Sequence, residues 1–304
     1  MFELSSKELK LVLHHPEDGF YQGTRFDRSG VFDSILFHGI EMAGAWFEKY
    51  SPTMHDAVQG PAEEFTPSSP IPVPSSPIPV PSSSGPTTPS SSGLSRGSLK
   101  IGVGLLSTGS DPYDRFRLYE IVDSGTWTVE ANEKSVAFRH VLNGIYDYRK
   151  EIVLTGHNSF EIRHTLDSDI PLEGEVYNHN FFTMGRMVTG PSRLIDFPFC
   201  PAGTWRAVYD SVGFTPSGIR FSRELNPGES VFTGDIHVEG SQGMPYAMTL
   251  REKDFSVKIS GDVPVTHTVM WANHRIACLE PYNAFRSAPA HPFRWTVRYL
   301  LGQV

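Results

Sequence analysis

Hydrophobic and polar residues alternate along most of the chain in short segments, a pattern typical of β-strands. Many of these segments are rich in β-branched or aromatic residues, and turn-forming residues such as Asn143-Gly144 and Asn226-Pro227-Gly228 separate them. The 3.6-residue period of an amphipathic helix is not sustained. We predict strands at residues 31–37, 127–129, 135–141, 151–154, 160–166, 218–221, 230–238, 247–250, 255–259 and 293–299.

This order of elements predicts an all-β fold. About ten or more strands without intervening helices favour a large antiparallel β-sandwich, in which two packed sheets leave one concave face open. We expect a ligand to bind on that face, where strand residues point inward and loops form walls. The chain has 304 residues, of which 39% are hydrophobic. One large core therefore suffices, and we expect a single domain over residues 1–304.

One segment interrupts the strand pattern. From residue 66 to residue 93 nearly every residue is Pro, Ser, Thr or Gly, and Ser-Ser-Pro-Ile-Pro-Val-Pro occurs at residues 68–74 and again at 75–81. Because this composition offers little apolar surface to bury, we predict a disordered Pro/Ser-rich insert over about residues 66–98. Its Pro-x-x-Pro spacing could serve an SH3 or WW domain, although a tolerated surface insertion is the simpler account.

Charge and targeting signals narrow the expected partners and location. The chain has 26 Lys and Arg against 34 Asp and Glu, a net charge of −8, so neither nucleic acid nor an anionic membrane is an expected partner. No signal peptide or apolar membrane span is apparent, which predicts a cytoplasmic protein. The two cysteines, Cys200 and Cys278, are too few for a disulfide framework, and we expect both to be buried thiols.

Two chemically capable side chains stand beside apolar segments. His179 lies between Asn178 and Asn180, which could orient its ring, and directly before Phe181-Phe182, so it is expected at a strand edge facing a wet pocket. Glu280 follows an apolar run and precedes Pro281, where a buried strand would end. Partial burial there would suit a general base, because burial raises a carboxyl pKa toward neutrality. Each residue could instead be structural.

A third polar segment brings His55, Glu63 and Glu64 close together in the sequence. Their spacing matches no strong metal signature, and no metal site is expected. Arg25 could reach a sugar hydroxyl or a phosphate, although surface pairing of Asp27 with Arg28 is a simpler account of that segment. The absence of Gly-x-Ser-x-Gly and His-Glu-x-x-His sequences argues against the commonest hydrolases.

Two of these segments resemble motifs of the aldose 1-epimerase and hexose-phosphate epimerase superfamily. One strand of that family carries Asn-His-x-(Tyr/Phe)-Phe, and residues 178–182, Asn-His-Asn-Phe-Phe, are similar to it. A later family strand ends in (Cys/Val)-(Leu/Val/Ile)-Glu-Pro, and residues 278–281, Cys-Leu-Glu-Pro, are similar to that. The resemblance covers the chain outside the insert and implies a galactose mutarotase-like β-sandwich.

The resemblance also implies roles for individual residues. His179 is similar to the family's general acid and Glu280 to its general base, and no cofactor is implied. His55 would be a further catalytic residue, although His-Asp-Ala stands here where the family has His-Gly-Gly. The residues expected to bind the substrate are Asn178, Arg25, Glu63, Glu64, Tyr177, Trp271 and Tyr282.

The expected function is therefore aldose 1-epimerase-like anomerisation of a hexose or hexose phosphate, with a small-molecule carbohydrate as the partner. A non-catalytic carbohydrate-binding sandwich is one alternative, because a fold does not dictate a function. A lyase-type β-elimination that uses Glu63 and Glu64 is another. A phosphorylated substrate would require at least one cation near the pocket, for which Arg25, Arg28 and Arg186 are the candidates.

Overall fold

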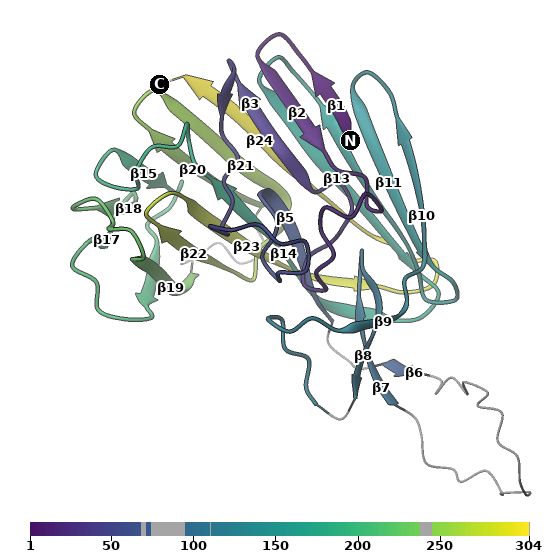
Figure 1. Ribbon diagram of the computed structural model, residues 1–304. Coiled ribbons are helices and arrows are strands. Elements are labelled where there is room, and N and C mark those ends of the chain that lie inside the picture. Colours follow the sequence, from purple (N-terminus) through teal and green to yellow (C-terminus); the bar gives the residue numbers. More distant parts are fainter. Residues whose placement is uncertain (68–70, 74–94, 110, 238–244, 304) are drawn as a thin grey trace, which may run out of the picture.

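The chain folds into antiparallel sheets, as a computed structural model shows for residues 1–67, 71–73, 95–109, 111–237 and 245–303 (Figure 1). These residues form 24 strands in four sheets and no helix. Accordingly, the described part of the chain contains no helix of the length and apolarity needed to cross a membrane. The predicted all-β class is confirmed.

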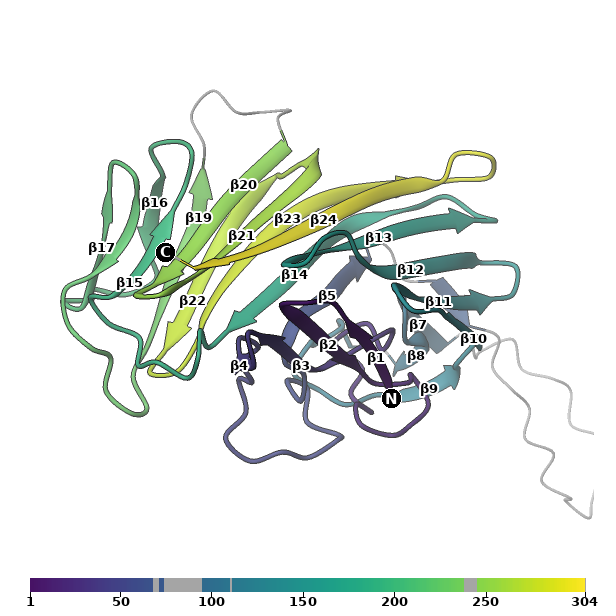
Figure 2. The same ribbon diagram turned by 90° about the horizontal axis from the view of Figure 1, so that it is seen from above.

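Two large sheets make up most of the molecule, and Figure 2 shows them from above. The ten-stranded sheet has the order β10 (Thr126–Ala131), β11 (Ser135–Leu142), β12 (Tyr146–Leu154), β13 (Ser159–Ser168), β24 (Phe293–Gln303), β21 (Phe255–Pro264), β20 (Pro245–Glu252), β15 (Arg193–Asp196), β18 (Gly218–Phe221) and β17 (Val212–Thr215). The six-stranded sheet has the order β16 (Ala202–Trp205), β19 (Ser230–His237), β22 (His267–Asn273), β23 (Ala277–Ser287), β14 (Leu172–Phe182) and β5 (Gly60–Pro67).

Two smaller sheets flank this sandwich. One joins β1 (Phe2–Ser5), β2 (Leu9–Leu13), β3 (Phe32–Phe37) and β4 (Ile40–Glu41). The other joins β6 (Ile71–Val73), β7 (Ser95–Lys100), β8 (Gly104–Gly109) and β9 (Glu120–Asp123). Most of the predicted insert lies outside the described residues. At its margins, residues 66–67 belong to β5, residues 71–73 form β6, and residues 95–98 belong to β7.

Each of the ten predicted strands coincides with an observed strand, but the end predicted at Glu280 is wrong. β23 continues through Pro281 to Ser287. Proline lacks an N–H group to donate, and the ladder between β14 and β23 has no pair at residues 280 and 281 before it resumes at Tyr282. Glu280 therefore projects from the middle of a central strand.

The core lies between the two large sheets. There, buried residues of the two sheets pack against each other. The ten-stranded sheet contributes residues such as Ile152, Ile162, Val257 and Val297, and the six-stranded sheet contributes residues such as Val176, Phe182, Leu279 and Phe285. Polar contacts also cross this layer. The Tyr299 hydroxyl on β24 donates to Oδ1 of Asn180 on β14 at 2.7 Å.

A buried ion cluster ties β12 of the ten-stranded sheet to β5 of the six-stranded sheet. The Lys150 ammonium contacts the Glu63 carboxylate, donates to the carbonyl of Ser29 at 2.8 Å, and lies 3.7 Å from Oδ2 of Asp27. All three charged side chains are at most 2% exposed. Because Asp27 and Ser29 belong to the loop between β2 and β3, the cluster also holds the segment that carries Arg25.

Removing this buried cation should destabilise the fold strongly. In Lys150→Met, the Glu63 carboxylate and the Ser29 carbonyl lose their donor and Asp27 loses its buried counter-charge, so the free energy of unfolding should fall by about 3–5 kcal/mol. This change is measured by urea denaturation, with tryptophan fluorescence as the signal of unfolding. The control Lys258→Met alters an exposed lysine on β21 and should unfold at the wild-type midpoint. Equal midpoints for the two variants would contradict the assigned role of the cluster.

Candidate functional site

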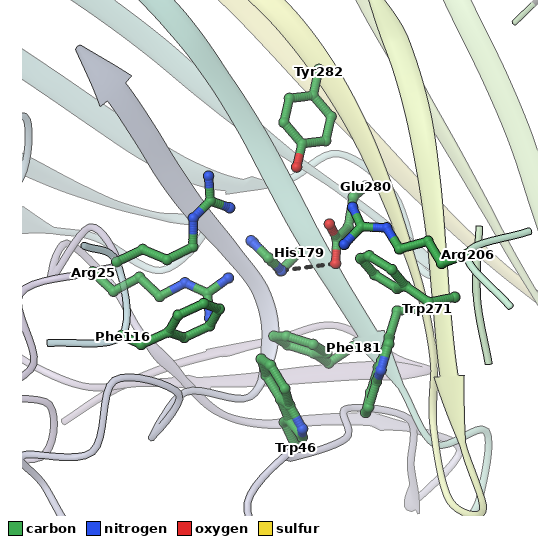
Figure 3. A pocket seen from close by; sticks show the side chains of 11 residues that line it. Arg25, Trp46, Phe116, His179, Phe181, Arg206, Trp271, Glu280 and Tyr282 are labelled. Carbon is green, nitrogen blue, oxygen red and sulfur yellow. Dashed lines mark ion pairs between the residues drawn. The ribbon is translucent and has the colours of Figure 1, made fainter. Parts of the chain in front are cut away.

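A cavity of about 350 Å³ opens on the face of the six-stranded sheet that points away from the ten-stranded sheet (Figure 3). Its charged lining residues are Arg25, Arg115, Arg206, His179 and Glu280. Its aromatic lining residues are Trp46, Phe116, Phe181, Phe232, Trp271 and Tyr282. The sheet supplies the floor, while loops preceding β3, β5 and β9 supply Arg25, Trp46 and the Arg115-Phe116 pair. This arrangement matches the predicted ligand face.

Strand alternation decides which residues of β14 reach this cavity. His179 and Phe181 face it, whereas Asn178 and Asn180 point toward the other sheet. Asn178 donates to Oε1 of Glu63 at 2.9 Å, and Asn180 donates to the carbonyl of Leu279 at 2.7 Å. The prediction that Asn178 contacts the substrate is therefore not supported, because its side chain is committed to the core.

The same alternation separates the two neighbouring carboxylates of β5. Glu63 joins the buried Lys150 cluster, whereas Glu64 points to the cavity side and meets Arg25. Gly60, at the start of β5, has a φ of 64°, a left-handed conformation that favours glycine and starts the strand beside Phe181. The structure therefore assigns Glu63 to the core, not to substrate binding.

His179 lies between two carboxylates. Its Nε2 atom is 3.2 Å from Oε2 of Glu64, and its Nδ1 atom is 3.1 Å from Oε1 of Glu280, the contact drawn in Figure 3. The side chains of His179 and Glu280 are 3% and 7% exposed. The Phe26 ring packs edge-on against the imidazole with a centroid distance of 4.9 Å. These contacts hold the imidazole and the Glu280 carboxylate side by side.

Glu64 anchors the cationic side chains of the cavity. Its Oε2 atom accepts a hydrogen bond from Nε of Arg25 at 2.7 Å, and its Oε1 atom lies 3.6 Å from Nε of Arg115. Burial opposes the charged form, but the hydrogen bond from His179 and the charges of Arg25 and Lys100 hold the pKa of Glu64 well below its usual range. Glu64 is therefore a permanent carboxylate that positions its neighbours.

Several buried polar atoms at this site have no hydrogen-bond partner among the described residues. They are Nη1 of Arg25, Oε1 of Glu64 and Nδ1 of His179. Buried polar atoms without partners are rare in folded proteins and costly. Two of the three are nevertheless within ion-pair distance of a partner, Nδ1 of His179 with Glu280 and Oε1 of Glu64 with Arg115.

The remaining predicted site residues divide between the cavity and its surroundings. Arg25, Trp271 and Tyr282 line it. Tyr177 stacks on Tyr282 with a centroid distance of 3.9 Å, and its hydroxyl accepts a hydrogen bond from Arg115. His55 does not line the cavity. It lies behind the wall, where its ring contacts Trp46 at 5.9 Å and Phe116 at 5.2 Å between centroids.

Two of the three arginines that are candidates for binding a phosphate do not line this cavity. Arg28 donates to the carbonyls of Gln22 and Gly23, and Arg186 lines a different cavity. Sequence inspection missed Arg115 and Arg206, which do line the cavity. The adjacent basic and aromatic residues at positions 115 and 116 were a weak signal for one of them, and no local pattern marks Arg206.

One set of side chains has the donor types of a metal site. Ligand atoms of His179, Cys278 and Glu280 lie within 4.8 Å of one another. Burial and the neighbouring Glu280 carboxylate raise the pKa of the Cys278 thiol well above its usual value, and its Sγ donates to Oε1 of Glu280 at 3.5 Å. Cys200, predicted to be buried, is exposed in the structure because it follows a surface turn after β15.

Comparisons with known proteins bear on the fold. No protein-family model and no curated protein sequence matches the chain. Several solved structures, however, match the chain. A galactose mutarotase-like protein from Lactobacillus casei ATCC 334 has a TM-score of 0.53 and 10% identity, with 99% of each chain covered. A galactose mutarotase-like protein from Clostridium acetobutylicum has a TM-score of 0.53 and 11% identity, covering 99% of this chain and 95% of its own.

A third similar structure is galactose 1-epimerase from Lactobacillus acidophilus NCFM. It has a TM-score of 0.51 and 8% identity, covering 98% of this chain and 92% of its own. The three matches extend over nearly the whole length of both partners, so they concern the complete sandwich and not one sheet. The chain therefore has the galactose mutarotase-like β-sandwich fold.

Proposed function

We propose that this protein is an aldose 1-epimerase-like isomerase, which interconverts the anomers of an aldose by acid–base ring opening. The observation that carries the proposal is the buried pair of His179 and Glu280, 3.1 Å apart at the floor of the cavity. An acid and a base held side by side suit a reaction that moves two protons on neighbouring oxygens. The cytoplasmic location and the carbohydrate partner expected from the sequence belong to the same proposal.

The proposed reaction needs no redox change. The Glu280 carboxylate takes the proton of the anomeric hydroxyl as the bond from C1 to the ring oxygen breaks, and the His179 imidazolium gives a proton to that oxygen. The open-chain aldehyde rotates about the bond between C1 and C2. Reclosure from the other face inverts C1 and returns both protons. Each positioned proton transfer contributes about 10²–10⁴-fold to the rate.

The other lining residues suit a pyranose ring. Trp46 and Trp271 lie 5.0 Å apart between centroids and offer flat apolar surfaces to the C–H face of a sugar. Arg25 lines the cavity, and its guanidinium group could donate to a ring hydroxyl. Glu64 holds both His179 and Arg25, so one carboxylate orients an acid and a binding group together.

No observation favours the lyase alternative. It relied on Glu63 and Glu64 acting together, but Glu63 is buried against Lys150 on the opposite face of β5. Glu64 is paired with Arg25 and has a strongly lowered pKa, which makes it a weak base. The non-catalytic binding module remains the competing function, and the two variants below separate it from catalysis.

Replacing the proposed base should abolish catalysis and preserve binding. Glu280→Gln keeps the side-chain volume but removes the carboxylate that accepts the proton. Anomerisation of the preferred aldose, followed by NMR exchange between anomeric protons, should slow by at least about a hundredfold. The dissociation constant of the sugar should stay within about tenfold of wild type, because the lost interaction belongs to the transition state. Glu130→Gln, on exposed strand β10, is the matched control.

Replacing the proposed acid should have a similar outcome. His179→Asn removes the imidazole proton donor, and we expect ring opening to slow by about 10²–10⁴-fold in the same assay. The matched control is His157→Asn, in the exposed turn after β12, which should leave the rate unchanged. Thermal melting checks that the variants fold. If folded Glu280→Gln and His179→Asn both turn over like wild type, the pair is structural. If wild type binds aldoses without accelerating anomerisation, the binding-module function is correct.

A further inference from the structure

Cys278 is a buried thiol that the proposed reaction does not use. It lies two residues before Glu280 on β23, and the two-residue repeat of a strand places both side chains on the same face. Its Sγ atom donates to Oε1 of Glu280 at 3.5 Å. The same oxygen lies 3.1 Å from Nδ1 of His179 on the neighbouring strand β14. A thiol, a carboxylate and an imidazole therefore meet beneath the cavity.

The spacing of these three groups suits a tetrahedral zinc ion. Zinc binds sulfur at about 2.3 Å, imidazole nitrogen at about 2.0–2.1 Å and carboxylate oxygen at about 2.0–2.2 Å. Tetrahedral angles then place nitrogen and oxygen about 3.3 Å apart, and sulfur and oxygen about 3.5 Å apart. The separations in the structure are 3.1 Å and 3.5 Å, and a ligand atom of each residue lies within 4.8 Å of the others. Little side-chain movement is therefore needed to bind the ion.

Glu64 holds the imidazole in the orientation that a metal requires. Its Oε2 atom lies 3.2 Å from Nε2 of His179 and also accepts a hydrogen bond from Arg25. Because an ionised carboxylate only accepts, Nε2 carries the hydrogen, and Nδ1 of the neutral ring has the lone pair. That lone pair points at a carboxylate oxygen of Glu280, so a proton or a cation must lie between the two acceptors. Metal-binding histidines commonly donate their other N–H group to a carboxylate in the same way.

A zinc ion also preserves the charge of this buried site. In the proposed reaction the site holds an imidazolium, a carboxylate and a neutral thiol. Zinc adds two positive charges and displaces two protons, one from the thiol and one from between His179 and Glu280, so the net charge does not change. A thiol that coordinates a metal loses its proton outright. Constant charge matters because all three residues are buried, where an uncompensated charge is costly.

We propose that His179, Cys278 and Glu280 bind one zinc ion and that the bound ion stops anomerisation. The three residues supply a nitrogen, a sulfur and an oxygen ligand, and the fourth position faces the cavity, because His179 and Glu280 line it. The ion occupies Nδ1 of His179 and Oε1 of Glu280, the atoms placed to move protons in the proposed reaction. Zinc binding does not depend on the proposed function, whereas the inhibition does.

Calorimetry on the wild-type protein tests the binding. With a non-thiol reductant and no chelator, it should show one zinc ion bound per chain, with a Kd of about 1 µM or less. Mg²⁺ at about 1 mM should give no heat of binding, because it prefers octahedral oxygen ligands. Cobalt in place of zinc should give a thiolate-to-cobalt absorption band in the near ultraviolet. Absence of zinc binding would overturn the proposal.

Two cysteine variants locate the ion. Cys278→Ala removes one of the three ligands and should weaken zinc binding by at least about a hundredfold, since losing even an outer partner of a ligand costs about 10–100-fold. It should also remove the cobalt–thiolate band. Cys200→Ala makes the same change at the exposed thiol and should bind zinc like wild type. Wild-type zinc affinity in Cys278→Ala, or loss of binding in Cys200→Ala, would contradict the assignment.

A third variant keeps the test decisive if Cys278→Ala does not fold, which thermal melting in the presence of chelator checks. Glu280→Gln removes the oxygen ligand and should weaken zinc binding by at least about a hundredfold on the same grounds. Unchanged zinc affinity in this variant would also contradict the assignment.

Kinetics separates the metal site from the proposed function. With zinc at about a hundredfold excess over its Kd, only about 1% of the wild-type protein stays metal-free, so anomeric exchange by NMR should fall at least about tenfold and recover with excess chelator. Cys278→Ala should show no fall relative to its own metal-free rate. If zinc binds through Cys278 but exchange continues or accelerates, the inhibition is wrong. If the metal-free protein anomerises no aldose, the isomerase function fails, and calorimetry and the cobalt band still decide the zinc site.

Discussion

The two-residue repeat of the β-strand is the constraint on which the candidate site depends. Along β14, His179 faces the cavity because Asn178 and Asn180 face the core, where Asn178 donates to Glu63 and Asn180 accepts from Tyr299. A slip of one residue in register would bury the imidazole between the sheets and expose both amides to the cavity. The buried asparagines thus specify the register that presents the proposed acid.

Glu64 connects this register to the loops. One carboxylate oxygen lies close to both His179 and Arg25, and the other lies toward Arg115. Its strongly lowered pKa follows from these cationic and hydrogen-bonding neighbours, which outweigh the cost of burial. Because the carboxylate stays charged, it can hold two loop arginines against a strand residue. The acid–base pair therefore lies beside a carboxylate that stays charged, and His179 is one of the groups that keep it so.

The two faces of the six-stranded sheet use buried charge differently. On the core face, Lys150 is surrounded by Glu63, Asp27 and a carbonyl group, which makes a closed cluster suited to stability. On the cavity face, Nη1 of Arg25 has no hydrogen-bond partner among the described residues, and the guanidinium group of Arg206 stacks on the Phe232 ring. Buried polar groups without partners cost stability, and they occur on both faces, since Oδ1 of Asn178 also lacks a partner among the described residues.

Local patterns in the sequence determined the all-β class, ten of the strands, and the choice of His179 and Glu280 as candidates, because alternation and turn residues act over a few neighbouring positions. Tertiary structure alone decided that Glu63 and Glu64 serve opposite faces, that Glu280 lies within a strand, and that Arg206 meets the cavity. Strand pairing and loop packing join residues more than a hundred positions apart. No local pattern records such contacts, since each depends on the register and packing of the whole sandwich.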